Sequence, residues 1–184
     1  MSKKEVILDV KNLSVELEGE KILENLSFRV RKGEVLTILG PNGAGKTVLL
    51  KTLLGLLPFK GKIKWKKGVK IGYVPQRLPF IKDIPLSVED FFKLKKISKE
   101  KIKEALFSVG IKELNILKKK VGELSSGQFQ RILIAFALVD EPDVLLFDEP
   151  MAGIDIGAEE TIYSFLERLR KKKRLTILLV THDL

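Results

Sequence analysis

The eight residues GPNGAGKT, at positions 40–47, constrain the fold of this chain more than any other feature. They match the pattern G-x-x-x-x-G-K-[ST], whose fixed positions are held by Gly40, Gly45, Lys46 and Thr47. The apolar run VLTIL precedes the motif directly, and a helical pattern follows it. A glycine-rich turn between a strand and a helix N-terminus lets backbone N–H groups surround phosphate oxygens. The motif therefore predicts a phosphate-binding loop in an α/β protein.

The rest of the sequence alternates between predicted strands and helices. Antiparallel strands are expected at residues 5–17 and 23–30, because polar and apolar residues alternate there, and a lysine-rich, half-exposed strand is expected near 60–70. The continuous apolar run at 35–39 predicts a strand buried on both faces. Further strands are predicted at residues 70–76, 143–149 and 175–181, and helices at 46–57, 127–139 and 157–173.

Residues 79–124 have a helical character and are predicted to form an insertion. A capping pattern begins at Ser87, and a second helix is predicted from Ser98 to Gly110, where glycine ends it. Near the end of this segment, Ser125 and Ser126 precede a long apolar run, which predicts another helix N-terminus. Taken alone, these two serines are a simple N-cap.

Composition excludes several classes of function. The chain has 184 residues, no cysteine and one histidine, so disulfides and the common zinc sites are excluded. No apolar run approaches the length of about 18 residues that crosses a bilayer, and no apolar signal region follows the first lysines, which favours a cytoplasmic location. The net charge of +10 is spread over separate lysine runs, which is typical of solvated faces rather than a nucleic-acid interface.

Two adjacent carboxylates follow the apolar run VLLF. Successive side chains at a strand end point to opposite sides. Asp148 is therefore placed to serve a Mg²⁺ ion together with the Thr47 hydroxyl, while Glu149 is placed to face an attacking water. Lys46 supplies a positive charge for the β and γ phosphates of a nucleotide. Without the phosphate loop, the same Asp-Glu pair would equally indicate a helix cap.

These motifs, together with LSSGQFQR at 124–131, resemble the ATP-binding subunits of ABC transporters. The resemblance covers nearly the whole chain and includes Gln76 in YVPQ, Asp155 in AGID and His182 in VTHD, in the family's order. It implies a P-loop NTPase core with a mainly parallel sheet, formed by residues 1–78 and 125–184. It also implies an N-terminal antiparallel β subdomain within residues 1–34 and 60–70, and a helical subdomain at 79–124.

The resemblance also implies which residues form the site and where the family continues beyond this chain. Nucleotide contacts are expected from Gly40, Pro41, Asn42, Gly43, Ala44, Gly45, Lys46, Thr47, Val48 and Leu17, and from Ser125, Ser126, Gly127, Gln128 and Asp155 across a dimer. Mg²⁺ contacts are expected from Thr47, Gln76 and Asp148, and catalytic roles from Glu149, His182 and Gln76. Because family members continue past the position of residue 184, the core is expected to be truncated at its C-terminus.

Three positions depart from the family pattern. Ser126 stands where glycine is usual, and Val48 stands where a second hydroxyl residue normally contacts the α-phosphate. Leu17 occupies the position of an aromatic ring that stacks on adenine, so aliphatic contact replaces stacking. We therefore expect these departures to affect nucleotide affinity and base preference.

The family resemblance implies a function and a set of partners. It implies an ATPase, with ATP and Mg²⁺, that powers transport as a head-to-tail homodimer on the inner face of the cell membrane. Its partners would be integral membrane permease subunits and, through them, a solute-binding protein, with no nucleic acid. The segments at 75–92 and 149–163 are similar to the subfamily that imports zinc or manganese. Two alternatives stay open: a soluble ABC-type ATPase that acts on nucleic acid, and a nucleotide-binding module without turnover.

Overall fold

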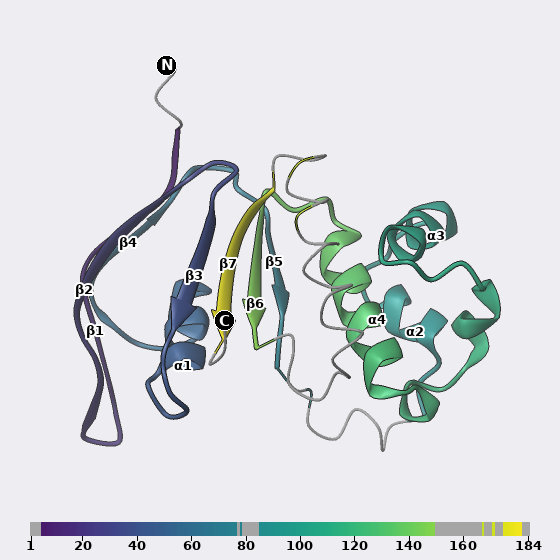
Figure 1. The fold of residues 1–184 in the computed structure, drawn as a ribbon, viewed down its shortest axis with the longest axis horizontal. Coiled ribbons are helices and arrows are strands. Elements are labelled where there is room, and N and C mark those ends of the chain that lie inside the picture. Colours follow the sequence, from purple (N-terminus) through teal and green to yellow (C-terminus); the bar gives the residue numbers. More distant parts are fainter. Residues whose placement is uncertain are drawn as a thin grey trace.

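The computed structural model describes residues 5–76, 78, 85–149, 167, 171 and 175–181. Figure 1 shows an antiparallel sheet, a central parallel sheet and a helical part, side by side. In chain order the elements are β1 (Val6–Leu17), β2 (Glu20–Arg31), β3 (Val35–Leu39), α1 (Lys46–Leu53), β4 (Lys60–Trp65), β5 (Ile71–Val74), α2 (Val88–Lys93), α3 (Lys99–Ser108), the 3₁₀ helices η2 (Leu114–Lys118) and η3 (Val121–Glu123), α4 (Ser126–Leu138), β6 (Val144–Asp148) and β7 (Thr176–Thr181). The predicted α/β class, with one antiparallel and one parallel sheet, is confirmed.

The antiparallel sheet has the strand order β2-β1-β4. Its inner face is apolar because alternate residues of each strand point inward, as the sequence pattern predicts. On the edge strand β4, Lys62 and Lys64 are exposed, whereas Trp65 is half-buried and its Nε1 donates a hydrogen bond to the Leu53 carbonyl at 2.9 Å. The lysines of this strand thus lie on a solvated edge, and Trp65 packs against the core.

The central sheet is parallel, with the strand order β3-β7-β6-β5. Leu39 pairs with Thr181, and Asp148 pairs with Val180, so the carboxyl ends of neighbouring strands lie level. Every residue of β6 and β7 is buried. In open α/β sheets, ligands bind outside the carboxyl ends of the strands. The phosphate loop follows β3 at this edge of the sheet, and Asp148 and Glu149 lie there at the end of β6.

Strand β3 corrects one prediction. Val35 is 45% exposed and Leu39 is 49% exposed, whereas the apolar run predicted burial on both faces. In the described sheet β3 is an edge strand, paired with β7 on one side. Leu36 and Ile38, which alternate with the exposed positions, pack against the core. A short apolar run records hydrophobicity but not which of its faces has a neighbour, so this prediction was wrong.

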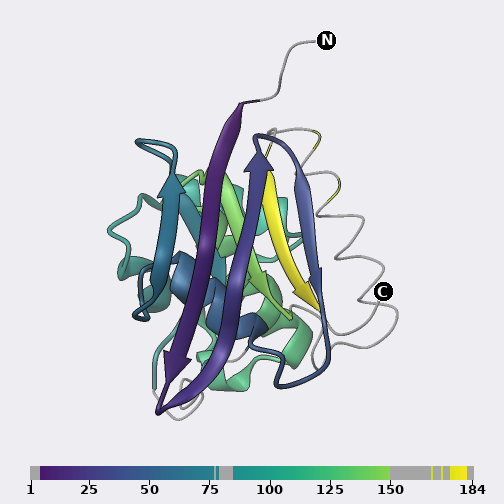
Figure 2. The ribbon, with the colours of Figure 1, turned by 90° about the vertical axis from the view of Figure 1, so that its left-hand side faces the viewer.

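Helix α1 lies between the two sheets (Figure 2). Its Leu49, Leu50 and Leu53 are buried in one cluster with residues of β1, β6 and β7. The helix ends at Leu53 rather than near residue 57 as predicted, because Gly55 adopts a φ of 73°. The N–H groups of residues 55 and 56 then bond to the carbonyls of residues 52 and 51, a glycine-dependent ending that the sequence analysis did not identify.

The helical part covers the opposite face of the central sheet, with α4 packed against it. The side chains of Ser87, Ser98 and Ser125 cap α2, α3 and α4, as the serine patterns predict for these positions. The rings of Phe91 in α2 and Phe136 in α4 stack with centroids 4.3 Å apart, which ties α2 to α4. Among the residues that the structure describes, no helix has the length and apolar character needed to cross a bilayer.

Candidate functional site

The phosphate loop leaves the N-terminus of α1 open to a ligand. Gly45 is the N-cap residue, with a φ of 79°, and no side chain caps the helix. A Cβ atom at Gly45 would lie 2.8 Å from Ile22 Cγ2, so the loop's close approach to β2 requires glycine here. The first turn of α1 contains no acidic residue. Its backbone N–H groups and the helix dipole therefore favour an anion such as a phosphate.

Lys46 is held inside the loop. It is 7% exposed, and its Nζ donates hydrogen bonds to the carbonyls of Gly40 at 2.8 Å and Pro41 at 2.9 Å. The same Nζ lies 3.3 Å from Glu149 Oε1. The ammonium group is thus satisfied by the loop backbone and by a carboxylate from the end of β6. A phosphate that binds Lys46 competes with Glu149 for this charge.

Asp148 is the last residue of β6 and is 1% exposed. The Thr47 hydroxyl donates to Asp148 Oδ1 at 2.9 Å, and the Tyr73 hydroxyl donates to Asp148 Oδ2 at 3.0 Å. Burial, followed by the negative charge of Asp148 and the hydrogen bond to it, raises the pKa of Tyr73 well above its usual value. Tyr73 therefore remains a hydrogen-bond donor at neutral pH.

Gln76 and Glu149 meet above the sheet edge. The Gln76 Nε2 donates a hydrogen bond to Glu149 Oε2, and the Glu149 N–H donates to the Val180 carbonyl at 3.0 Å. Glu149 has a φ of 45°, in the left-handed region that few non-glycine residues adopt. A residue in this conformation persists only where the surrounding contacts hold it, and such residues are frequent at functional sites.

Lys46, Gln76 and Glu149 line one pocket of about 540 Å³. The residues that line it are Ile22, Asn42, Gly43, Gly45, Lys46, Thr47, Val48, Gln76 and Glu149. The pocket thus brings together three segments that the sequence analysis selected separately: the phosphate loop, the YVPQ segment and the end of β6. Ile22 was not selected, and the sequence signal for it is weak, because nothing in the β2 pattern distinguishes it from other apolar residues.

Other candidate residues lie away from this pocket. Leu17 is half-buried near the β1–β2 turn and packs against the core below the antiparallel sheet. Residues 125–128 begin α4, where Ser125 Oγ accepts from the Gln128 N–H at 3.2 Å and Gln128 Oε1 accepts from the Ser125 N–H at 3.1 Å. Ser125 and Ser126 are exposed. Asp155 and His182 lie outside the described residues.

The geometry fits a nucleotide with a hard cation. The Thr47 hydroxyl and the Asp148 carboxylate are oxygen ligands of the kind that Mg²⁺ prefers. Within the described ranges, no group of three or more acidic, histidine or cysteine residues could hold a metal by itself. Mg²⁺ commonly binds through one or two carboxylates together with substrate phosphates, and this site offers one buried carboxylate, that of Asp148.

Comparisons with known proteins agree with this site. The sequence profile of the family described as "ABC transporter" matches residues 23–152. The zinc import ATP-binding protein ZnuC of Pasteurella multocida is 38% identical over 180 residues, covering 97% of this chain and 68% of that protein. A Thermotoga maritima protein named "Probable metal transport system ATP-binding protein" is 40% identical over 185 residues, covering 97% of this chain and 75% of that protein.

Solved structures show the same fold. The structure of cbiO1 from Clostridium perfringens, part of the ABC transporter complex cbiONQ, superposes with a TM-score of 0.82 at 30% sequence identity. The match covers 98% of this chain and 80% of that chain. An ATP-binding cassette of an ABC transporter in its ADP conformation superposes with a TM-score of 0.81 at 25% identity, covering 97% of this chain and 82% of that one.

Proposed function

Because the chain belongs to the ABC transporter family as an ATP-binding subunit, we propose that it hydrolyses ATP to power the import of a divalent metal such as zinc or manganese. ATPase activity is characteristic of this family, whose ATP-binding subunits work with membrane permeases. The proposal places this subunit on the inner face of the cell membrane, against a permease that receives the metal from a solute-binding protein.

The pocket at the carboxyl edge of the central sheet carries the proposal. It is lined by the uncapped N-terminus of α1, by Lys46 and by Glu149. The Lys46 Nζ lies 3.3 Å from Glu149 Oε1. The helix terminus and Lys46 suit the triphosphate, and Glu149 is the carboxylate that would act as general base on the attacking water. Gln76, bonded to Glu149, links this base to the segment that leads into the helical part.

The Mg²⁺ ion of this proposal would be held by Thr47 and Asp148, with Gln76 nearby. Bound Mg²⁺ neutralises charge that develops on the phosphates. The protein's own contribution is to keep one buried carboxylate oriented by two hydroxyl donors, from Thr47 and Tyr73. This arrangement leaves the phosphates of ATP to complete the cation's oxygen ligands.

The second half of each site would come from another copy of this chain. Ser125, Ser126 and Gly127 open a helix whose N-terminus faces solvent and not the pocket of the same chain. A helix N-terminus of this kind favours an anion, as the phosphate loop does. Head-to-tail pairing would place it against the γ-phosphate held by Lys46 of the second copy. Asp155 is proposed to bridge this interface, and His182 is proposed to contact the γ-phosphate beside Glu149.

Hydrolysis is tested by phosphate release from the purified chain, with Lys46→Ala as the matched variant. The wild-type chain is expected to release phosphate with Mg²⁺ and ATP. The variant is expected to lose this activity, because the triphosphate loses the buried ammonium group of Lys46. Equal rates for the two proteins would contradict the proposal. Binding of ATP without turnover in the wild type would instead favour a nucleotide-binding module.

The cargo is tested in cells that lack their own zinc and manganese importers. Expression of the chain together with the permease that it is proposed to serve is expected to restore growth in the presence of a metal chelator. The same pair with Lys46→Ala is not expected to restore growth. The relatives named for zinc import and metal transport support this choice of cargo. Uptake of another solute, without restored growth on scarce zinc or manganese, would overturn the proposed cargo but not the proposed ATP hydrolysis.

A further inference from the structure

We propose that Tyr73 is a positioning residue of the nucleotide site. Its hydroxyl fixes the orientation of the Asp148 carboxylate and thereby determines how tightly the site takes a divalent cation together with ATP. The inference rests on the proposed function, because it assumes that Asp148 serves a nucleotide-bound cation. No motif in the sequence assigns a role to Tyr73.

The two oxygens of Asp148 are both occupied by hydroxyl donors. Oδ1 accepts from Thr47 at 2.9 Å and Oδ2 accepts from Tyr73 at 3.0 Å. The last side-chain torsion of aspartate is broad, so a carboxylate held by one donor can turn about its Cβ–Cγ bond. Because one donor comes from α1 and the other from β5, and each bonds to a different oxygen, the carboxylate is held at both oxygens. Since Asp148 is 1% exposed, water does not replace a lost donor readily.

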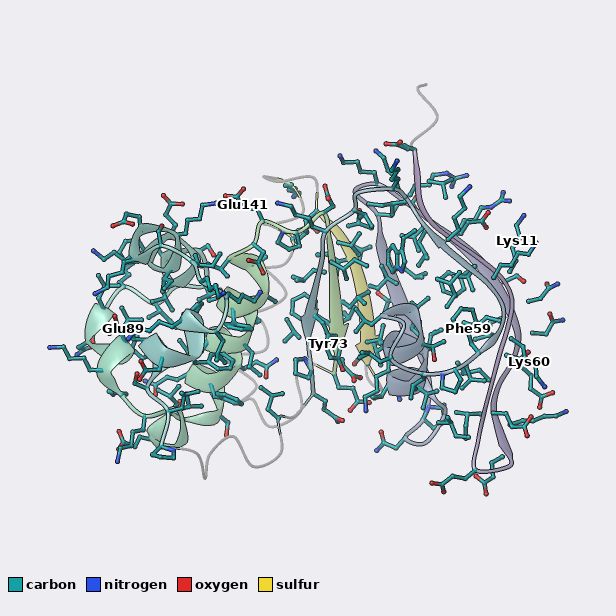
Figure 3. All side chains as sticks on the ribbon, turned by 180° about the vertical axis from the view of Figure 1, so that it is seen from behind. Lys11, Phe59, Lys60, Tyr73, Glu89 and Glu141 are labelled. Carbon is teal, nitrogen blue, oxygen red and sulfur yellow. The ribbon has the colours of Figure 1, made fainter. Side chains whose placement is uncertain are left out.

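The position of Tyr73 in the sheet explains why its hydroxyl reaches Asp148. Strands β5 and β6 are parallel neighbours, and Tyr73 pairs with Leu146, two residues before Asp148. Its ring packs against the core cluster that also contains Leu146. Figure 3 shows Tyr73 on the central sheet, between the helical part and α1. The ring is therefore fixed by packing, and the hydroxyl is delivered along the strand toward the carboxyl edge.

Thr47 depends on the same arrangement. Its hydroxyl has one proton, which it donates to Asp148 Oδ1, and this leaves its lone pairs for a cation. If the carboxylate turns, Thr47 loses the acceptor that orients it. Removal of the Tyr73 hydroxyl would therefore disturb both oxygen groups proposed to serve the cation, although Tyr73 contacts neither the cation nor ATP. Hydrogen-bond partners of metal ligands commonly change metal affinity in this way.

The test compares wild type, Tyr73→Phe and Thr52→Val. Tyr73→Phe removes the hydroxyl and keeps the ring. Thr52→Val is the matched control, because it removes a buried hydroxyl that donates to the Val48 carbonyl within α1 and does not touch Asp148. Binding of the non-hydrolysable analogue AMP-PNP is measured by calorimetry in EDTA and at increasing Mg²⁺, and Mn²⁺ bound with the analogue is observed by electron paramagnetic resonance.

We expect Tyr73→Phe to bind the analogue within about twofold of wild type in EDTA, because the phosphate loop is unchanged. Its half-saturating Mg²⁺ concentration should rise by roughly 10- to 100-fold, and the Mn²⁺ spectrum should change. Thr52→Val should keep the wild-type metal dependence even where its urea midpoint falls. Tyr73→Met, which also lacks the hydroxyl, should repeat the Phe result.

A double-variant comparison shows whether Tyr73 acts through Asp148. In an Asp148→Asn background, Tyr73→Phe should produce no further change in the half-saturating Mg²⁺ concentration. Unchanged metal dependence in both Tyr73 variants, or an equal further change in the Asn background, would overturn the inference. If wild type itself bound AMP-PNP no better with Mg²⁺ than Lys46→Ala, the proposed function would fail first, and the two failures are thus separate.

Discussion

Replacement of Glu149 by Gln tests the contact between Lys46 and Glu149. The change removes one negative charge from the pocket and leaves the size of the side chain unchanged. Both partners are nearly buried, with side-chain exposures of 6% and 10%, and their charged atoms lie 3.3 Å apart. At an effective dielectric constant of about 20, Coulomb's law gives a gross attraction of about 5 kcal/mol at this distance.

Desolvation of the two charges offsets most of this attraction. We take a remainder of about 1.4 kcal/mol, which corresponds to a tenfold change in an equilibrium constant. A triphosphate that binds Lys46 must displace Glu149, so the variant is expected to bind ATP about tenfold more tightly than wild type. Its hydrolysis rate is expected to fall by roughly 10²- to 10⁴-fold, because the amide cannot accept the proton of the attacking water.

The assay measures ATP binding by calorimetry, phosphate release by absorbance, and dimerisation by size-exclusion chromatography with ATP and Mg²⁺. Glu89→Gln is the control, because it makes the same chemical change at another ion pair, in which Glu89 Oε1 lies 3.3 Å from Lys99 Nζ. Glu89 is on α2 in the helical part, and it does not line the pocket (Figure 3). The Glu149 variant should accumulate as a dimer, and the control should behave as wild type. Weaker ATP binding by the Glu149 variant would refute the competition between the carboxylate and phosphate, and hydrolysis within tenfold of wild type would refute the role as base.

Three further predictions concern local structure. Ser125→Ala removes the side-chain cap of α4 and should lower the free energy of unfolding in urea by about 1 kcal/mol, as well as weaken ATP-dependent dimerisation. Gly55→Ala places a Cβ at a φ of 73° and should lower the thermal midpoint, at a cost of about 1 kcal/mol, without a change in ATP affinity. Among the described residues, Gln130 Nε2 is buried without a hydrogen-bond partner. Gln130→Met should therefore leave the free energy of unfolding in urea unchanged or raise it by up to about 1 kcal/mol. A lower free energy of unfolding would contradict this expectation.

Local signals predicted much of the fold. Serine caps at residues 87, 98 and 125 act within one helical turn, and alternation along β1 and β4 reflects a period of two residues. The end of α1 was missed because the decisive residue, Gly55, lies inside an apolar stretch that continues the helical pattern. The exposure of β3 was missed because it depends on what packs against each face of the strand, and a short apolar run does not record this.

The candidate site follows the same division between local and distant information. The phosphate loop and the Asp-Glu pair have motifs of their own, so the sequence selected them. Tyr73 lies in YVPQ, but that motif was selected for Gln76, and Ile22 lies in no motif. The importance of both comes from contacts with distant segments: the Tyr73 hydroxyl bonds to a residue 75 positions later. Such contacts require the sheet order, which the alternation of strands and helices does not determine.

The strand order has a consequence for synthesis of the protein. β7, the last strand described, lies between β3 and β6, so the phosphate loop and Asp148 belong to parts of the sheet that β7 joins. While a nascent chain emerges from the ribosome, the first 175 residues contain β3 and the β5–β6 pair of this sheet but not the strand that joins them. A site that needs both the phosphate loop and Asp148 is therefore completed only when β7 pairs with both strands, and a chain arrested before β7 would leave unpaired backbone N–H and C=O groups along the facing edges of β3 and β6.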